Sequence, residues 1–133
     1  MKVIVDTSIW SLALRRKTKT SDLIVNKLSD LIADGRVVLL GAVRQEILSG
    51  VKHQEQFDKL KNNLRAFPDL LLDVEDYELA AEYFNICRQN GIQGANTDFL
   101  ICAAANQRNY EIFTTDKDFI NFSQYLPIVL TSI

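Results

Sequence analysis

The chain has 133 residues, of which 47% are hydrophobic and 24% are charged, and its formal net charge is −2 at pH 7. This composition is that of a globular protein long enough to bury one core, so we expect a single domain over residues 1–133. It excludes an intrinsically disordered chain, and it lacks the global basic field of many nucleic-acid-binding proteins, so any such role depends on local patches.

The chain shows no signal for export or membrane insertion. Its first five residues lead directly into an apolar, strand-like segment, without the basic region and cleavage site of a signal peptide. No apolar run approaches the roughly 20 residues that a membrane-spanning helix needs. We therefore expect a cytoplasmic protein that makes no membrane contact.

Cysteine and histidine are too few to build a zinc site. Cys87 and Cys102 each lie within an apolar helical stripe, where a buried, reduced thiol is the expected state. His53 is the single histidine of the sequence, so the usual His and Cys ligand sets of zinc are missing. Any metal must therefore be bound by oxygen ligands.

Five short apolar runs predict strands that are buried on both faces. They are residues 3–5, 37–40, 70–72, 112–113 and 128–130. Helical patterns lie between them, and parallel strands need the crossover connections that helices supply. This order predicts an α/β fold with a mostly parallel sheet flanked by helices.

Apolar stripes with helical spacing predict the helices. The first stripe follows a capping segment at residues 20–22, ends at Gly35, and consists of Leu23, Ile24, Leu28, Leu31 and Ile32. The second ends before Gly91 and consists of Tyr77, Ala80, Ala81, Phe84 and Cys87. A further helix begins near Thr97 and is apolar almost all round over residues 99–105, which predicts burial. The polar segment 53–65 predicts a partly exposed helix.

Two acidic residues closely follow predicted strands. Asp6 comes directly after residues 3–5, and Asp116 follows residues 112–113 after two threonines. In open α/β sheets, ligands bind beyond the carboxyl ends of the strands. We therefore expect both carboxylates at the same functional edge of the sheet.

Asp98 and Glu46 are weaker candidates when each is taken alone. Asp98 opens the buried helix, where unpaired backbone N–H groups favour an acid for structural reasons alone. Glu46 follows the predicted strand at residues 37–40, and a surface glutamate is its simpler interpretation. Gathered at one edge with Asp6 and Asp116, they would repel one another, each close pair by about 4 kcal/mol at an effective dielectric near 20. A hard divalent cation such as Mg²⁺ or Mn²⁺ offsets that repulsion and matches oxygen ligands.

Four motifs follow one another along the chain. They are Val5-Asp6-Thr7-Ser8-Ile9-Trp10, Glu46 followed by Gly50, Thr97-Asp98-Phe99-Leu100-Ile101-Cys102-Ala103-Ala104, and Thr114-Thr115-Asp116-Lys117-Asp118-Phe119. In this order and spacing the sequence resembles the PIN-domain nucleases, in particular the VapC-type toxins of bacterial toxin–antitoxin pairs. Each motif is weak alone, but together they are specific and cover essentially the whole chain.

The resemblance implies a PIN-like three-layer α/β/α sandwich with a central, mostly parallel sheet. It also implies one catalytic acidic quartet that holds Mg²⁺ or Mn²⁺: Asp6, Glu46, Asp98 and Asp116. Ser8 matches the hydroxyl residue that supports the first aspartate in similar proteins. Asp118 matches either a further acidic ligand or an exposed residue at a helix start.

The activity implied by the resemblance is metal-dependent hydrolysis of RNA phosphodiester bonds by an endoribonuclease. The implied partners are the RNA substrate, a cognate antitoxin that inserts a segment into the acidic site, and a second copy in a homodimer. The alternative is a catalytically inactive PIN-like module that binds RNA or protein. A covalent Asp6 nucleophile, as in aspartate-dependent phosphatases, is disfavoured because Ser8 stands where those enzymes generally carry a second acid.

Basic residues near the acids are candidates for contacts to substrate phosphates. Arg15 and Arg16 lie soon after the first aspartate, and Arg44 and Lys117 lie beside two of the other acids. The alternative for each is a solvated charge at a helix end or in a loop. Trp10 could stack on a base, but so close to the first strand a core position is the simpler interpretation.

Overall fold

The computed structural model describes residues 1–15 and 19–133, and the side chains of residues 1–14 and 23–133. Within this part of the chain, three strands form a parallel sheet in the order β2-β1-β3: β1 (Val3–Val5), β2 (Val37–Val38) and β3 (Glu111–Phe113). In the register, Ile4 lies opposite Val38 on one side and Ile112 on the other. Because the strands all run the same way, their carboxyl ends share one edge of the sheet.

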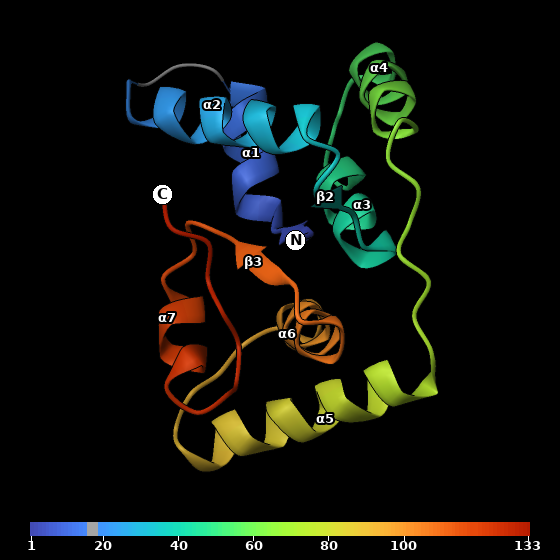
Figure 1. The fold of residues 1–133 in the computed structure, drawn as a ribbon. Coiled ribbons are helices and arrows are strands. Elements are labelled where there is room, and N and C mark those ends of the chain that lie inside the picture. Colours follow the sequence, from blue (N-terminus) through green and yellow to red (C-terminus); the bar gives the residue numbers. More distant parts are fainter. Residues whose placement is uncertain (16–18) are drawn as a thin grey trace.

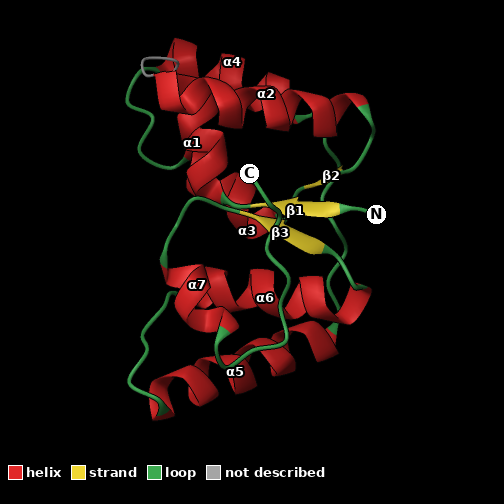
Figure 2. Ribbon diagram, turned by 60° about the vertical axis from the view of Figure 1, so that its left-hand side comes forward, coloured by secondary structure: helices red, strands yellow, loops and turns green. Residues whose placement is uncertain are grey.

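Seven helices connect and cover these strands within the described residues. They are α1 (Thr7–Arg15), α2 (Lys19–Ala33), α3 (Gly41–Leu48), α4 (Gln54–Leu64), α5 (Val74–Gln89), α6 (Asn96–Arg108) and α7 (Asp118–Ser123). Figure 1 shows the course of the chain, with α6 seen end-on above α5, against which it packs. Figure 2 shows α1, α2 and α4 on one side of the sheet and α5, α6 and α7 on the other. The predicted α/β fold, with helices on both sides of a parallel sheet, is confirmed.

Two of the predicted strands, at residues 70–72 and 128–130, do not form. Each region contributes only an isolated parallel bridge, and the pairs are Leu39 with Asp69 and Ile112 with Leu130. Both segments follow shortly after a proline, which has no N–H to donate to a neighbouring strand. Leu71 is 88% exposed, so residues 70–72 lack the burial that a central strand requires.

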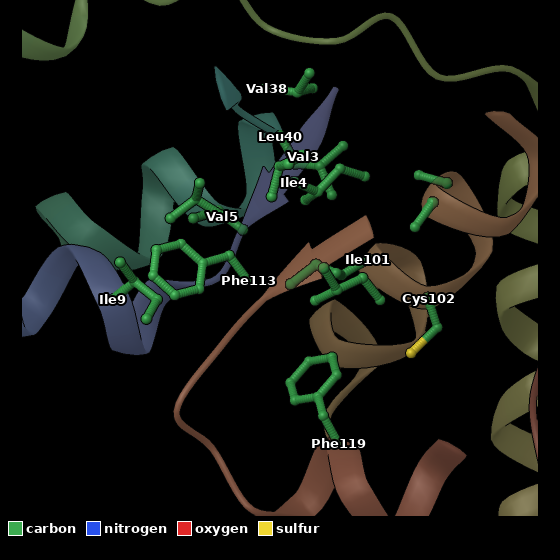
Figure 3. Packing of buried hydrophobic residues seen from close by; sticks show 14 of the residues in the cluster. Val3, Ile4, Val5, Ile9, Val38, Leu40, Ile101, Cys102, Phe113 and Phe119 are labelled. Atoms are coloured by element: carbon green, nitrogen blue, oxygen red, sulfur yellow. The ribbon is translucent and has the colours of Figure 1, made fainter. Parts of the chain in front are cut away.

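The core lies on both faces of the sheet. All of β1 is buried, and in α6 the five consecutive residues 101–105 are each buried, as the continuous apolar run predicted. Figure 3 shows the side chains of β1 and β3 among those of α1 and α6. Cys87 and Cys102 are buried free thiols, as predicted, and burial raises the pKa of both. No helix in the described ranges is long and apolar enough to cross a membrane.

Helix α2 buries a narrower stripe than the sequence predicted. It begins at Lys19, so the predicted capping segment 20–22 lies inside the helix and not before it. Leu23 and Ile32 are exposed, and the buried members of the stripe are Ile24, Leu28 and Leu31. These three follow the i, i+4, i+7 spacing that one neighbouring helix covers, and α2 packs mainly on α1.

Helix α5 is rotated by about one position from the predicted stripe. Tyr77 is 57% exposed and Ala81 is also exposed, and the buried residues are Asp76, Ala80, Tyr83 and Cys87. The reason is the fully buried Asp76, which pairs with Arg108 of α6 at 2.7 Å. A buried carboxylate must face its partner, so this ion pair sets the rotation of α5 and leaves Tyr77 in solvent.

Candidate active site

The four predicted carboxylates line one pocket at the carboxyl edge of the sheet. Asp6 follows β1 directly, and Asp116 lies three residues after β3. Glu46 comes from α3 and Asp98 from the first turn of α6. The pocket has a volume of about 620 Å³, and its remaining lining residues are Thr7, Ser8, Ala42, Gln45, Ser49 and Thr97. Asp6 and Asp116, which are 110 positions apart, therefore meet at the edge that the parallel sheet predicted, and Glu46 and Asp98 line the same pocket.

Asp6 is held by two hydroxyl groups. Ser8 Oγ and Thr114 Oγ1 each donate a hydrogen bond to Asp6 Oδ2 at 2.8 Å. Asp6 is only 5% exposed, and a buried carboxylate is stable only if it is hydrogen-bonded or paired. Ser8 therefore supports Asp6, as the resemblance implied. Thr114 was missed by the sequence analysis, although it belongs to the motif that ends in Asp116.

Glu46 and Asp116 are also positioned by hydrogen bonds, each to one carboxylate oxygen. Thr7 Oγ1 donates to Glu46 Oε1 at 2.7 Å, which links α1 to α3. The backbone N–H of Asp118 donates to Asp116 Oδ1 at 2.9 Å, and the backbone N–H of Asp116 donates to Thr114 Oγ1 at 3.0 Å. Thr114 thus contacts both Asp6 and the backbone of Asp116, and it connects the two strand ends.

Asp98 is the carboxylate of the pocket whose pKa is raised. Its Oδ2 accepts a hydrogen bond from the backbone N–H of Ala95 at 3.0 Å, which is the structural role of an acid at a helix start. Burial, and after it the negative charges of Asp6, Asp116 and Glu46, together raise the pKa of Asp98 to about 6. Asp98 therefore has both the structural role and a place in the acidic cluster.

In the described part of the chain, each of the four carboxylates has one oxygen that accepts a hydrogen bond and one that accepts none. Among the residues that the structure describes, no donor reaches the second oxygens, which are Asp6 Oδ1, Glu46 Oε2, Asp98 Oδ1 and Asp116 Oδ2. In the same part of the chain, no three acidic, histidine or cysteine side chains converge closely enough to form a ready-made metal cage. Mg²⁺ usually keeps several waters and needs only one or two carboxylates, so the residues fit a partly hydrated divalent cation.

Comparison with known families decides the classification. The profile of the PIN domain matches residues 3–124. The chain belongs to the PIN-domain family. PIN domains are generally nucleases, and they typically use divalent metals. No functionally curated protein matches the chain in sequence.

Solved structures share the fold of this PIN domain at low sequence identity. FitAcB from Neisseria gonorrhoeae is 20% identical with a TM-score of 0.76, and the alignment covers 97% of this chain and 96% of that one. VapBC2 from Rickettsia felis, bound to a DNA fragment from its promoter, is 19% identical with a TM-score of 0.79 and 98% coverage of both chains. VapBC-1 from nontypeable Haemophilus influenzae is 16% identical with a TM-score of 0.76 and coverages of 99% and 98%. Each of them has the same three-layer architecture as this PIN domain.

The remaining predicted site residues lie outside the acidic pocket of this PIN domain or outside the described residues. The side chain of Asp118 is exposed and does not line the pocket; only its backbone N–H contributes, through Asp116. Lys117 is likewise exposed and absent from the pocket wall. The side chain of Arg15 and all of Arg16 lie outside the described residues.

Arg44 and Trp10 are structural residues. Arg44 Nε donates to Asp69 at 2.9 Å, Nη1 donates to the carbonyl of Leu64 at 3.1 Å, and Nη2 donates to the carbonyl of Phe67. Its whole guanidinium group therefore ties α3 to the end of α4 and the loop that follows. Trp10 is only 6% exposed and packs edge-on against Phe67 at 5.4 Å between ring centroids, so it is a core residue.

Proposed function

We propose that this PIN domain is a divalent-metal-dependent endoribonuclease that hydrolyses RNA phosphodiester bonds. The observation that supports it most directly is the set of four carboxylates in one pocket, each with one oxygen fixed and the other without a hydrogen bond. Like charges gathered in one partly buried pocket repel one another, and a bound cation offsets that repulsion. The proposal assigns Asp6, Glu46, Asp98 and Asp116 as the ligands of that cation.

In this mechanism the protein supplies rigidity and charge. A bound Mg²⁺ or Mn²⁺ would supply an activated water and neutralise charge on the phosphate. Ser8 and Thr114 keep Asp6 from rotating, and Thr7 does the same for Glu46. The backbone N–H groups of Ala95 and Asp118 fix the rotamers of Asp98 and Asp116. Such outer contacts orient the ligand oxygens and set the affinity of the site.

We further propose that the nuclease is the toxin of a VapBC-type pair with a cognate antitoxin. The support is the sequence resemblance to VapC-type toxins and the fold shared with structures named VapBC. An acidic pocket suits a cationic inhibitory segment, because a guanidinium group pairs well with carboxylates. We also propose that the toxin forms a homodimer through the exposed apolar residues of α1 and α2, such as Leu14 and Leu23. Sedimentation of the Leu14→Glu and Leu23→Glu variants tests this interface, and dimers in both variants would contradict it.

The nuclease is tested by incubating the purified protein with cellular RNA and Mg²⁺ or Mn²⁺. We expect cleavage that EDTA abolishes and that is lost in Asp6→Asn and Asp98→Asn, because Asn keeps the shape but removes the ligand charge. Asp34→Asn, an exposed acid outside the pocket, and Asp118→Asn are the controls and should cleave normally. Intact RNA in every lane, with RNA still bound, would instead favour the inactive binding module.

A further inference from the structure

A second feature of the structure adjoins the acidic pocket along α5 and α6, which lie side by side in both Figure 1 and Figure 2. The acidic pocket shares Thr97 with a middle pocket of about 420 Å³. The middle pocket shares Phe84 with an end pocket of about 200 Å³. We call these three adjoining pockets the trough. The three pockets thus follow one another away from the proposed catalytic carboxylates, and each neighbouring pair shares a lining residue.

The middle pocket is uncharged and has the chemistry of a base-binding site. Its apolar walls come from Tyr77, Ala81 and Phe84 of α5 and Leu100 of α6, and two amides, Asn85 and Asn96, stand among them. None of its lining residues is acidic or basic. Aromatic faces stack on unpaired bases, and amide side chains can both donate to and accept from base edges. Because the pocket is uncharged, it suits a base better than a phosphate.

The end pocket supplies a cation. Arg88 lines it together with Gln93 and Gly94. Arg88 is exposed, and in the described part of the chain it forms no ion pair. This contrasts with Arg44 and Arg108, whose guanidinium groups are used within the fold. An unpaired guanidinium beside an apolar pocket suits a phosphate of the same strand whose base lies in that pocket.

We propose that the trough is the substrate track for single-stranded RNA. This inference rests on the proposed nuclease function. The scissile phosphate lies at the acidic pocket, the base of a neighbouring nucleotide stacks on Tyr77 and Phe84 in the middle pocket, and a phosphate further along the strand pairs with Arg88. A duplex cannot follow this path, because its bases are stacked and paired and do not reach a side pocket.

The rotation of α5 explains why the track exists. The ion pair between Asp76 and Arg108 turns Tyr77 out of the core. Small residues at positions 80 and 81 leave space beside it. An aromatic ring that is more than half exposed next to such a space offers a surface on which a planar group can stack.

The test measures binding of a short, labelled single-stranded RNA by fluorescence polarisation, using Asp98→Asn as the parent so that no strand is cut. We expect Tyr77→Ala to weaken binding roughly 5- to 150-fold, which is the range for loss of one base stack. We expect Arg88→Gln to reduce the slope of log affinity against log salt by about 0.7, the value for one phosphate contact on a single strand. The matched controls Tyr125→Ala and Arg65→Gln, both exposed and outside the trough, should bind like the parent.

A second experiment tests which nucleotide places its base in the middle pocket. In the wild-type enzyme, an abasic nucleotide next to the cleaved bond should reduce kcat/KM, and the same lesion should have little further effect in Tyr77→Ala, because both changes remove one stack. If Tyr77→Ala and Arg88→Gln bind RNA as well as the parent, the track is wrong. If the variants lose RNA binding and sedimentation shows that they have also lost a dimer that the parent forms, this face is a dimer interface. The proposed track is then also wrong. Failure of the nuclease itself would appear separately, as absence of cleavage in the wild type.

Discussion

Carboxylates lie in two partly or fully buried places of the molecule, and their pKa values are shifted in opposite directions. Between α5 and α6, Asp76 is fully buried and paired with Arg108, and the hydrogen bonds from Arg108 hold its pKa well below the usual range. In the acidic pocket, burial and three like charges raise the pKa of Asp98 to about 6. The charge of Asp76 is neutralised within the fold, whereas no cationic side chain of the described residues pairs with Asp98. A paired acid such as Asp76 stabilises the fold, and an unpaired one such as Asp98 is the candidate for the proposed function.

The largest expected effect is on the compensated pair. Asp76→Ala leaves Arg108 and Gln107 without the carboxylate that both contact, and breaking one side of a buried ion pair costs about 3–5 kcal/mol. Urea unfolding followed by circular dichroism measures the loss. Asp73→Ala, which removes the cap but leaves the ion pair, should cost only about 1 kcal/mol. Equal losses in the two variants would show that the pair adds nothing beyond the cap.

The pair also gives the wild type a defined dependence on acid. Because the pKa of Asp76 is lowered in the folded state, its contribution is fully present above the ordinary value of 3.8 and is lost as pH falls below it. Asp76→Asn carries no such charge. The difference in unfolding free energy between wild type and Asp76→Asn should therefore shrink below that pH. A difference that stays constant down to the acid limit would contradict the assigned cause.

The uncompensated site should respond to cations. Mn²⁺ or Mg²⁺ at 100 times its dissociation constant should stabilise the wild type by about 2.7 kcal/mol, because it binds only the folded state. Differential scanning fluorimetry with and without EDTA shows this as a rise in Tm. Asp98→Asn should lose most of the rise, and Asp34→Asn should keep it. An equal rise in all three proteins would mean that the ion binds elsewhere.

Without metal, the charge of Asp98 should lower the free energy of unfolding. Asp98→Asn in EDTA at pH 7 to 8 should be more stable than the wild type by about 1–2 kcal/mol, after allowance for solvent screening of a partly exposed group. The wild type recovers this as pH falls from about 6 toward 3.8, because the folded state takes up a proton that the unfolded chain does not bind. Chemical unfolding at several pH values measures both. A wild type that is the more stable protein in EDTA would refute uncompensated charge at this position.

The smallest effect concerns the hydroxyl groups that position Asp6. Thr114→Val removes one of its two donors and should cost about 1 kcal/mol of stability, while lowering metal affinity about 10- to 100-fold through the freed carboxylate. Thr114→Ser should restore both. Isothermal titration with Mn²⁺ separates this positioning role from a purely structural one, in which affinity would not change.

The sequence was sufficient to predict that Asp6 and Asp116 lie close together, because that prediction depends only on the residues at the strand ends. A buried strand followed by an acid, repeated in a parallel sheet, brings Asp6 and Asp116 to one edge whatever the other details of the fold. The rotation of α5 could not be predicted in the same way, since it depends on a pair, Asp76 with Arg108, whose members are far apart in the chain. The structural role of Arg44 was hidden for the same reason, because two of its acceptors are backbone carbonyls that no side-chain pattern reveals.

The pairing of β1 with β3 has a consequence for folding during synthesis. Val3 lies opposite Glu111, and the hydroxyl of Thr114 reaches back to Asp6 across 108 positions. Contacts of such long sequence separation form late, after much of the chain has been ordered. During synthesis from the N-terminus, Asp6 is made 108 residues before its partner Thr114, so the two cannot meet until β3 has been made. A nascent chain that ends before β3 therefore has neither Thr114 nor Asp116 to complete the acidic pocket.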